Sequence, residues 1–441
     1  MAQASFRFPR GFLWGTATAS HQVEGNNVHN NWWVWEQQSG HIINGDKSGL
    51  ACDWWGGRWR EDFDRAAEAG QNAHRLSIEW SRIQPALDRW DEEALDRYIE
   101  ILRGLHERNM TPLVTLHHFT DPTWLHELGD WENEKVVGYF EAYVGKVVEA
   151  LREYASLWVT INEPNVLAIS AYLAGSWPPQ KKSVSSTYRV MTNLVRAHAI
   201  AFHTIHRLQP QARVGLAINT RPFLPRASWS PLDRWIARLA SQVFNEFFPH
   251  AAQSGKLRFP GFSRRLPEAQ GTQDYLGINY YNRDYVSANL FNIVKSVESS
   301  SFPPGSEVSH SKMFANDPPG FFQAFKWGVK FGIPIIVTEN GIEDADDLLR
   351  PRYLIQHVHQ MWRAVNFNIP VKGYFHWTLV DNFEWERGWS QRFGLWELDV
   401  ETQMRRKRLS ADLYAEICRE NGLTSDTVER YAPQLVEIMF P

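Results

Sequence analysis

The segment Leu157-Trp158-Val159-Thr160-Ile161-Asn162-Glu163-Pro164 decides the fold, because a largely apolar run ends there in a polar pair. The run from Leu157 to Ile161 is rich in β-branched and aromatic residues, which is typical of a buried strand. Pro164 has no N–H and disfavours the helical conformation at the residue before it. We therefore expect Glu163 to lie at the carboxyl-terminal tip of a buried strand.

A second carboxylate occurs in the same setting. Ile335-Ile336-Val337-Thr338 has the pattern of another buried strand, and it is followed by Glu339-Asn340-Gly341, which is a turn signal. A single glutamate at a strand end is usually a helix cap or a member of an ion pair. Two glutamates at strand tips of one chain indicate acid and base chemistry.

The rest of the chain repeats a strand followed by a helix. Strands are expected at residues 11–19, 73–78, 112–116, 157–161, 213–218, 275–279, 335–338 and 373–379. Apolar residues recur at helical spacing between these runs. Eight alternating units without a linker-like change in composition predict an α/β protein, a single (β/α)8 TIM barrel. We expect residues 1–441 to form one catalytic domain, with long loops at the carboxyl-terminal face of the barrel.

Composition and motifs exclude several classes of protein. With 43% hydrophobic and 22% charged residues the chain is not disordered, and a net charge of −4 argues against a nucleic-acid-binding protein. No glycine-rich nucleotide-binding motif follows the first expected strand, and Cys52 and Cys418 give no metal or disulfide pattern. We therefore expect neither a cofactor nor a metal.

The sequence also bears on location and assembly. No apolar stretch is long enough to span a bilayer, and residues 1–10 contain no apolar core of signal-peptide length. We expect a cytoplasmic protein. No pattern in the chain indicates its oligomeric state.

In a (β/α)8 barrel every strand tip opens on the same face, where active sites are built. The expected tips supply an arginine, hydrogen-bonding groups and aromatic rings, at Gln22, Arg75, His118, Asn162, Glu163, Asn279, Tyr281, Glu339 and Trp377. Each residue alone would serve to cap a loop, whereas all of them together indicate a binding site. The 21 tryptophans favour a carbohydrate ligand, because indole rings stack on the C–H faces of sugars.

Two facing glutamates suit the hydrolysis of a glycosidic bond. One carboxyl group must protonate the leaving oxygen while another stays ionised to stabilise the anomeric carbon. A separation of about 5 to 5.5 Å between the two groups would make the enzyme retaining. Arg75 would keep one carboxylate ionised, and the pKa of the other would be raised by its like-charged neighbour.

Several motifs resemble those of one known family. They are Phe12-Leu13-Trp14-Gly15-Thr16-Ala17-Thr18-Ala19-Ser20, Thr160 to Pro164, Thr338-Glu339-Asn340-Gly341, and Trp377 through Asp381-Asn382-Phe383-Glu384-Trp385 to Arg392-Phe393-Gly394. From about Phe8 to Glu420 the chain resembles family 1 of the glycoside hydrolases, the β-glucosidase-like retaining enzymes. The resemblance implies that Glu163 is the acid/base and Glu339 the nucleophile.

The resemblance also implies the residues around the sugar. Substrate-binding side chains are implied at Gln22, His118, Phe119, Asn162, Tyr281, Trp377, Glu384, Trp385 and Phe393. Arg75 and Asn279, together with Tyr281, are implied to support the nucleophile. Phe119 stands where many members of the family have tryptophan, so a stacking surface is kept and an indole N–H donor is lost.

The activity implied is that of a β-glucosidase that also accepts β-D-fucosyl and β-D-galactosyl residues, by double displacement through a covalent glycosyl-enzyme. Two other interpretations are weaker. An inactive sugar-binding relative is expected to lack one of the two glutamates, and both are present. A 6-phospho-β-glycosidase is expected to carry Ser and Lys near Glu384 to hold a phosphate, which Glu384 would repel.

The aglycone half of the site consists of loops, and two apolar segments near it allow two interpretations. One includes Trp229, Leu232 and Trp235 with Arg226 nearby, and the other includes Leu290, Phe291, Ile293 and Val294. The first segment is explained by packing on the inner face of a barrel helix. Alternatively, both line an apolar entrance, which predicts aryl, terpenoid or steryl aglycones and weak peripheral contact with a membrane.

Overall fold

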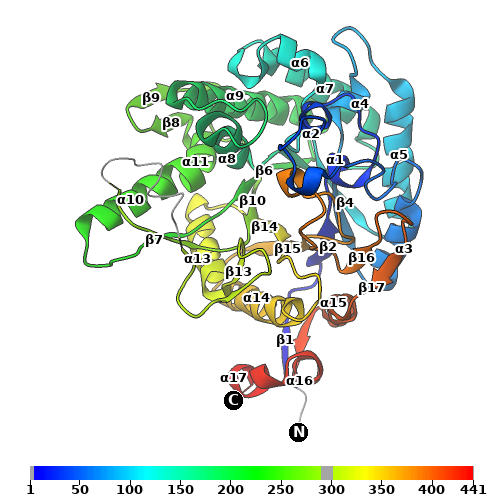
Figure 1. Ribbon diagram of the computed structural model, residues 1–441, viewed down its shortest axis with the longest axis vertical. Helices are drawn as coiled ribbons and strands as arrows, with labels where there is room; N and C mark the ends of the chain where they lie inside the picture. The colour runs from blue at the N-terminus through cyan, green and yellow to red at the C-terminus, as the bar shows by residue number, and fades with distance from the viewer. Residues whose placement is uncertain (1–3, 290–300, 441) are drawn as a thin grey trace.

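The computed structural model describes residues 4–289 and 301–440, in which eight parallel strands close into a barrel (Figure 1). In chain order the barrel strands are β2 (Leu13–Ala17), β3 (Ala73–Ser77), β4 (Thr111–Thr115), β5 (Leu157–Asn162), β6 (Arg213–Asn219), β10 (Tyr275–Tyr280), β14 (Ile335–Asn340) and β15 (Val371–His376). β15 pairs in parallel with β2, and Gly373 lies opposite Leu13, which closes the sheet. The predicted (β/α)8 barrel is confirmed.

Helices between the strands cover the outside of the barrel. The main ones are α3 (Trp59–Glu68), α5 (Glu92–Glu107), α7 (Val136–Leu151), α9 (Val184–Leu208), α11 (Phe247–Ser254), α13 (Pro318–Gly328), α14 (Arg350–Asn366) and α15 (Leu409–Glu420). Their apolar residues recur every three or four positions and face the sheet, as in α7, where Phe140, Val144 and Val147 are buried.

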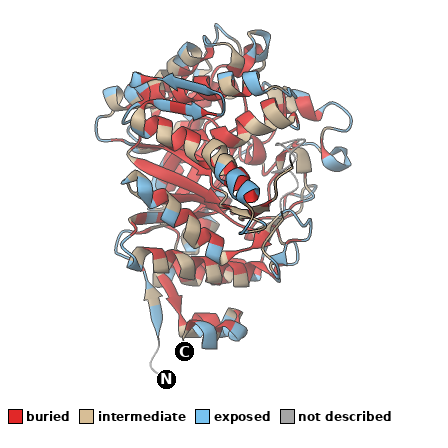
Figure 2. Cartoon of the chain, turned by 90° about the vertical axis from the view of Figure 1, so that its left-hand side faces the viewer, coloured by how far each residue is buried: buried red, intermediate tan, exposed pale blue. Residues whose placement is uncertain are grey.

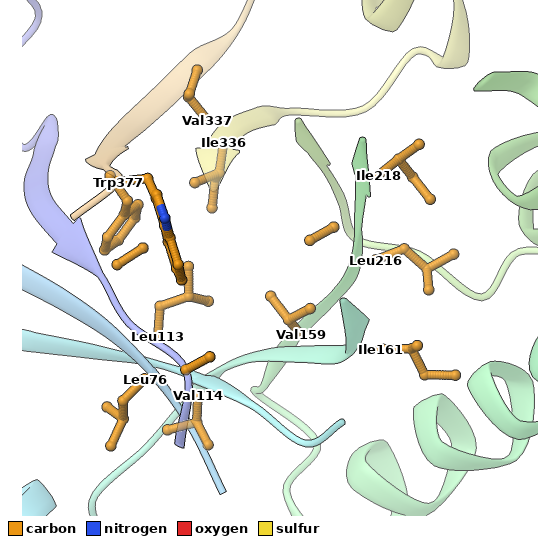
Figure 3. Close-up of a cluster of buried hydrophobic side chains, with 14 of the residues drawn as sticks. Leu76, Leu113, Val114, Val159, Ile161, Leu216, Ile218, Ile336, Val337 and Trp377 are labelled. Atoms are coloured by element: carbon orange, nitrogen blue, oxygen red, sulfur yellow. The ribbon is translucent and has the colours of Figure 1, made fainter. Parts of the chain in front are cut away.

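The buried core extends nearly from one end of the chain to the other. Its main cluster contains both Phe8 and Met439, and the barrel strands are buried throughout most of their length (Figure 2). Figure 3 shows part of this cluster, with aliphatic side chains of neighbouring strands beside Trp377. Close to both ends, β1 (Ser5–Arg7) pairs antiparallel with β18 (Gly422–Thr424), outside the barrel.

Every barrel strand differs from its predicted range by one or more residues at one or both ends. β14 continues through Asn340, because its ladder with β10 and β15 extends to Asn340, so Glu339 lies within the strand. β15 ends at His376, three residues before the predicted end. Arg75 is also placed differently, since it lies in the middle of β3 and not at its tip.

The helix predicted after the fifth strand is two helices. α10 (Pro231–Ser241) packs on a two-stranded sheet of β7 (Phe223–Pro225) and β11 (Asp284–Val286), and α11 follows it on the main core. The buried residues of α10, such as Ile236 and Ala240, belong to a small separate cluster with Phe223 and Val286. α10 therefore lies at the edge of the molecule, on the left of Figure 1.

For the first apolar segment, the prediction that its residues pack on the inner face of a barrel helix is therefore only partly right. It holds for Ile236 but not for Trp229, Leu232 and Trp235, which are exposed. The second apolar segment, with Leu290, Phe291, Ile293 and Val294, lies outside the described residues. In the described parts of the chain, no helix combines the length and the apolar character that crossing a bilayer requires.

Gly15 on β2 is a position where a side chain does not fit. A Cβ atom there would lie 2.4 Å from the carbonyl oxygen of Ala73 and 2.9 Å from the ring of Phe375. We expect Gly15→Ala to lower the free energy of unfolding by about 1–3 kcal/mol, as overpacking does. The matched control is Gly138→Ala on α7, where a Cβ atom meets nothing within 4 Å and alanine favours the helix. Thermal unfolding of Gly15→Ala at or above the temperature of the parent would contradict this expectation.

Candidate active site

Glu163 follows the last residue of β5 and adopts an unusual backbone conformation. Its φ of 43° and ψ of 54° are left-handed, and Pro164 begins the next helix, α8 (Pro164–Ala168). The N–H of Glu163 donates to the carbonyl oxygen of Ala217 at 2.7 Å, which holds the turn against β6. Left-handed residues other than glycine are uncommon and cluster at functional sites.

Two amides hold the carboxyl group of Glu163. Its Oε1 accepts hydrogen bonds from Asn279 Nδ2 at 2.8 Å and from Asn219 Nδ2 at 3.0 Å. Burial, and then the negative charge of Glu339, raise the pKa of Glu163 to about 8, against the opposing effect of the two amides. Glu163 is therefore mostly protonated at neutral pH and can donate a proton.

Glu339 has the contacts expected of an ionised carboxylate. Its Oε1 accepts from Arg75 Nη1 at 2.7 Å, and its Oε2 accepts from the hydroxyl of Tyr281 at 2.7 Å. Burial raises the pKa of Glu339, whereas the charge of Arg75 and the hydrogen bond from Tyr281 lower it. Since Arg75 pairs with Glu339 and not with Glu163, the negative charge of the pair is better stabilised on Glu339.

Arg75 joins several strands in one buried network. Besides Glu339, its guanidinium donates to Asn162 Oδ1 at 2.6 Å, to Thr115 Oγ1 at 3.1 Å and to the carbonyl oxygen of Thr338 at 3.0 Å. Its side chain is completely buried. The ends of β4, β5 and β14 are thereby held around one guanidinium, which positions Glu339.

Asn279 links the hydrogen-bond networks around Glu163 and Glu339. Its Nδ2 donates to both Glu163 Oε1 and Asn162 Oδ1, and its Oδ1 accepts from Thr338 Oγ1 at 2.6 Å. The amide is therefore oriented by its partners, with its N–H groups directed at Glu163 and Asn162.

Gln22 and Glu384 form a second polar group at the site. Gln22 lies on α1 (Ser20–Val23), and its Nε2 donates to Glu384 Oε2 at 3.1 Å and to the carbonyl oxygen of Phe383 at 2.8 Å. Burial, and then the charges of Glu339 and Glu386, raise the pKa of Glu384 to about 8, while a hydrogen bond from Trp377 lowers it. The charge of Glu384 thus changes near neutral pH.

The ring of His118 lies close to two tryptophan rings and nearly parallel to them. Its ring centroid is 6.1 Å from that of Trp377 and 6.0 Å from that of Trp385, with interplanar angles of 27° and 19°. Burial, together with the charge of Arg75, holds the pKa of His118 well below its usual value, so the ring is neutral. Its Nε2 lies 3.0 Å from Asn162 Nδ2, so Nε2 accepts and Nδ1 carries the proton.

Three buried polar atoms in this group have no hydrogen-bond partner within the described residues. They are Gln22 Oε1, His118 Nδ1 and Asn382 Nδ2. Leaving a buried donor or acceptor unpaired costs about 1–3 kcal/mol, so such atoms call for a polar ligand. The set contains donors and an acceptor, which matches the hydroxyl groups of a sugar.

Aromatic rings form the other wall of the site. Phe119 contacts Trp177 and Trp385 edge to face, at centroid distances of 4.8 and 5.2 Å. Phe393 contacts Tyr281 in the same way at 6.2 Å. Apart from Arg75, which reaches the site from the middle of β3, the site residues predicted from the sequence lie at or above the carboxyl end of the barrel, and each contacts at least one other member of the set.

Sequence analysis assigned no role to four residues of this region, namely Asn219, Trp177, Asn382 and Glu386. Asn219 is the last residue of β6, one position beyond the predicted strand, so a longer strand would have included it among the tips. Trp177 Nε1 donates to Glu386 Oε2 at 2.7 Å. Both lie on segments without helical or strand periodicity, so no sequence pattern marks them.

Comparison with known proteins identifies the family. The model of glycosyl hydrolase family 1 matches residues 4–423. The chain is 32% identical to a 1,4-β-D-glucan glucohydrolase of Thermotoga neapolitana, over 95% of this chain and 99% of that protein. The chain therefore belongs to glycosyl hydrolase family 1, and it is a retaining β-glycosidase.

Solved structures agree with this assignment. A β-glycosidase from Pyrococcus horikoshii is similar with a TM-score of 0.90 and 38% identity, covering 97% of this chain and 98% of that one. A family 1 β-glucosidase from Thermotoga maritima is similar with a TM-score of 0.89 and 31% identity, covering 95% and 99%. The resemblance seen in the sequence motifs is confirmed.

Asn219 offers a test of the electrostatics at Glu163. Removing its amide in Asn219→Ala deletes a hydrogen bond that favours the ionised form, so the pKa of Glu163 should rise. We expect the alkaline limb of the pH profile of kcat/KM to move upward by up to about one pH unit. An unchanged or lower alkaline limb in the variant would show that Asn219 does not tune Glu163.

Proposed function

We propose that the protein is a β-glucosidase in which Glu163 is the acid/base and Glu339 the nucleophile. The observation that carries this assignment is that Arg75 forms an ion pair with Glu339 and not with Glu163. This pairing favours an ionised Glu339 beside a protonated Glu163. The names of the Thermotoga relatives, a glucan glucohydrolase and a β-glucosidase, support glucose as the sugar.

The proposed reaction has two displacement steps. In the first, Glu339 attacks the anomeric carbon while Glu163 gives its proton to the leaving oxygen, which leaves a glycosyl ester on Glu339. The ester carries no negative charge, so the pKa of Glu163 falls. In the second step Glu163 takes a proton from water, the water attacks the anomeric carbon, and Glu339 is released. Two inversions retain the β-configuration.

The sugar is proposed to bind between the polar group of Gln22 and Glu384 and the aromatic wall. The unpaired atoms of Gln22, His118 and Asn382 would meet its hydroxyl groups. Trp377 would lie beneath the ring, and Asn162, Tyr281, Trp385, Phe119 and Phe393 complete the substrate-binding set. Arg75 and Asn279 position Glu339 and Glu163 without contacting the sugar.

The proposal extends to the domain organisation, the partner and the location of the enzyme. We infer one catalytic domain over residues 1–441, supported by a main core that contains both Phe8 and Met439. The partner is a small β-glycoside, and the roles given to Glu163 and Glu339 involve no metal or cofactor. The proposed location is the cytoplasm, with weak peripheral contact with a membrane through the exposed side chains of Trp229, Leu232 and Trp235.

Azide rescue distinguishes the two glutamates. In Glu163→Ala, a substrate with an activated leaving group such as a dinitrophenyl glucoside should still form the glycosyl-enzyme, and azide should intercept it to give a β-glycosyl azide. In Glu339→Gly no glycosyl-enzyme can form. Azide then attacks the anomeric carbon from the face opposite the leaving group and should give an α-glycosyl azide. NMR of the products identifies the anomer, and exchanged outcomes would mean that the two roles are reversed.

Glu384 provides a pH-dependent test of sugar choice. Above about pH 8 it should be ionised and repel a phosphate on the 6-hydroxyl, whereas below that pH its neutral form repels less. We expect nitrophenyl glucoside to be preferred over its 6-phosphate, with a kcat/KM ratio that rises with pH. The ratio cancels the titration of Glu163, which is common to both substrates. A preferred phosphorylated substrate would contradict the role of Glu384.

A second candidate is a β-glucosidase specialised for bulky apolar aglycones. The exposure of Trp229, Leu232 and Trp235 favours it, because α10 and β7 extend the loop that follows β6. Under this hypothesis kcat/KM is higher for octyl glucoside than for cellobiose, and Trp229→Ser with Trp235→Ser lowers only the former. Equal values for the two substrates in the parent, or a higher value for cellobiose, would contradict this hypothesis.

A further inference from the structure

α10 presents an apolar surface to solvent. Trp229, just before the helix, is 80% exposed, and Trp235 and Leu232 are 51% and 47% exposed. The helix itself is well anchored, since Ser230 caps its first turn and Asp233 accepts from the N–H groups of Ala227 and Ala288. Exposed rings of this size, held on a rigid helix, are not needed for packing. We call Trp229, Leu232 and Trp235 the α10 face.

The surrounding chain is strongly basic. Residues 221–265 contain eight lysines and arginines against two acidic residues, Asp233 and Glu246, in a protein whose net charge is −4. The excess of positive charge is therefore concentrated in this segment, and the remainder of the chain is acidic. The basic residues are Arg221, Arg226, Arg234, Arg238, Lys256, Arg258, Arg264 and Arg265.

Among the residues that the structure describes, most of these cations have no carboxylate partner. Within the described residues Arg221 alone of the eight forms an ion pair, with Asp284 at 3.4 Å. Arg226 and Arg234 donate to neutral oxygens of Ser301 and Ser228. In the rest of the protein arginines are commonly paired, as Arg408 is with Asp381. The unpaired cations leave the basic segment available for an anionic partner.

A crevice beside the α10 face collects several of these charges. It has a volume of about 650 Å³ and lies between α10 and α11, lined by Arg234, Arg238, Arg258 and His250 with Glu246 as its one acid. Burial, then the charge of Arg258, lowers the pKa of His250, so the positive charge comes from the arginines. Three guanidinium groups on one crevice suit phosphate oxygens, which they bind as a fork.

The β-hairpin that follows α11 is also basic and also carries an exposed aromatic ring. β8 (Lys256–Phe259) and β9 (Phe262–Arg265) pair antiparallel and carry the exposed cations Lys256, Arg264 and Arg265. Phe262 at their turn is 43% exposed. The hairpin therefore carries exposed cations and an exposed aromatic ring, as α10 does.

This surface lies at the same end of the barrel as the active site. β7 and β11, on which α10 packs, extend the loops that leave β6 and β10. The carboxyl end of β6 carries Asn219, which contacts Glu163, and Tyr281, which contacts Glu339, directly follows β10. A surface docked on α10 would therefore lie beside the mouth of the barrel. Figure 2 views this side of the molecule.

We propose that the α10 face and its basic crevice dock the protein on an anionic lipid surface. Trp229, Trp235 and Leu232 enter the headgroup region, where tryptophan is favoured, while arginines of the crevice meet lipid phosphates. The apolar leucine between the rings favours lipid over single-stranded nucleic acid, whose bases require stacking surfaces and not aliphatic groups. Docking is independent of the catalytic roles of Glu163 and Glu339.

Vesicle sedimentation tests this docking with the intact protein. Phosphatidylglycerol vesicles should bind it, phosphatidylcholine vesicles should bind it at least tenfold more weakly, and 0.5 M NaCl should reduce binding to the former. Trp229→Ser with Trp235→Ser, and separately Arg234→Gln with Arg238→Gln, should each lower partitioning about tenfold or more. All variants should keep the circular dichroism spectrum and the unfolding temperature of the parent, which shows that they are folded.

Matched controls lie elsewhere on the surface. Phe367→Ser removes a ring that is 66% exposed, and Lys330→Gln removes an exposed cation, and neither should change partitioning. Equal binding to neutral and anionic vesicles, no binding at low salt, or equal losses in the control variants would overturn the proposal. Displacement of bound protein from vesicles by equimolar single-stranded DNA would overturn it in favour of a nucleic-acid partner.

Discussion

The ion pair between Arg75 and Glu339 is the interaction on which the site depends. A charge buried in the barrel is tolerated only if it is paired, and removing one member of a buried pair costs about 3–5 kcal/mol. Arg75 is completely buried and contacts Glu339, Asn162 and Thr115, so the strand ends must meet at the distances that satisfy its donors. The same pair explains why one of two neighbouring glutamates is held as an anion.

The second constraint is that two carboxyl groups in one dry site do not both ionise readily. Burial raises the pKa of both Glu163 and Glu339, and each negative charge disfavours the other. Arg75 and Tyr281 resolve this competition at Glu339, whereas Glu163 accepts hydrogen bonds from the amides of Asn279 and Asn219, and the charge of Arg221 has a smaller effect on it. The acid and the nucleophile of the proposed mechanism follow from this difference in partners.

Much of this arrangement was predictable from local patterns. The buried runs that end at Glu163 and before Glu339 indicate strands, and strand tips of a closed barrel must share one face. What the sequence did not indicate depends on tertiary packing. Nothing local shows that Arg75 reaches its partners from the middle of β3, or that α10 leaves the barrel for a small separate core. Trp177 and Glu386 meet only because two loops converge.

The central claim is that Glu339 carries the sugar between the two steps. The fluorine of a 2-deoxy-2-fluoroglucoside should slow both steps, because it disfavours positive charge at the neighbouring anomeric carbon. A dinitrophenyl leaving group should speed only the first step, so the glycosyl-enzyme should accumulate. Mass spectrometry of the digested, inactivated protein then locates the sugar. The account predicts one fluoroglucosyl group on the peptide that contains Glu339. A label on the peptide that contains Glu163, or inactivation without any label, would contradict it.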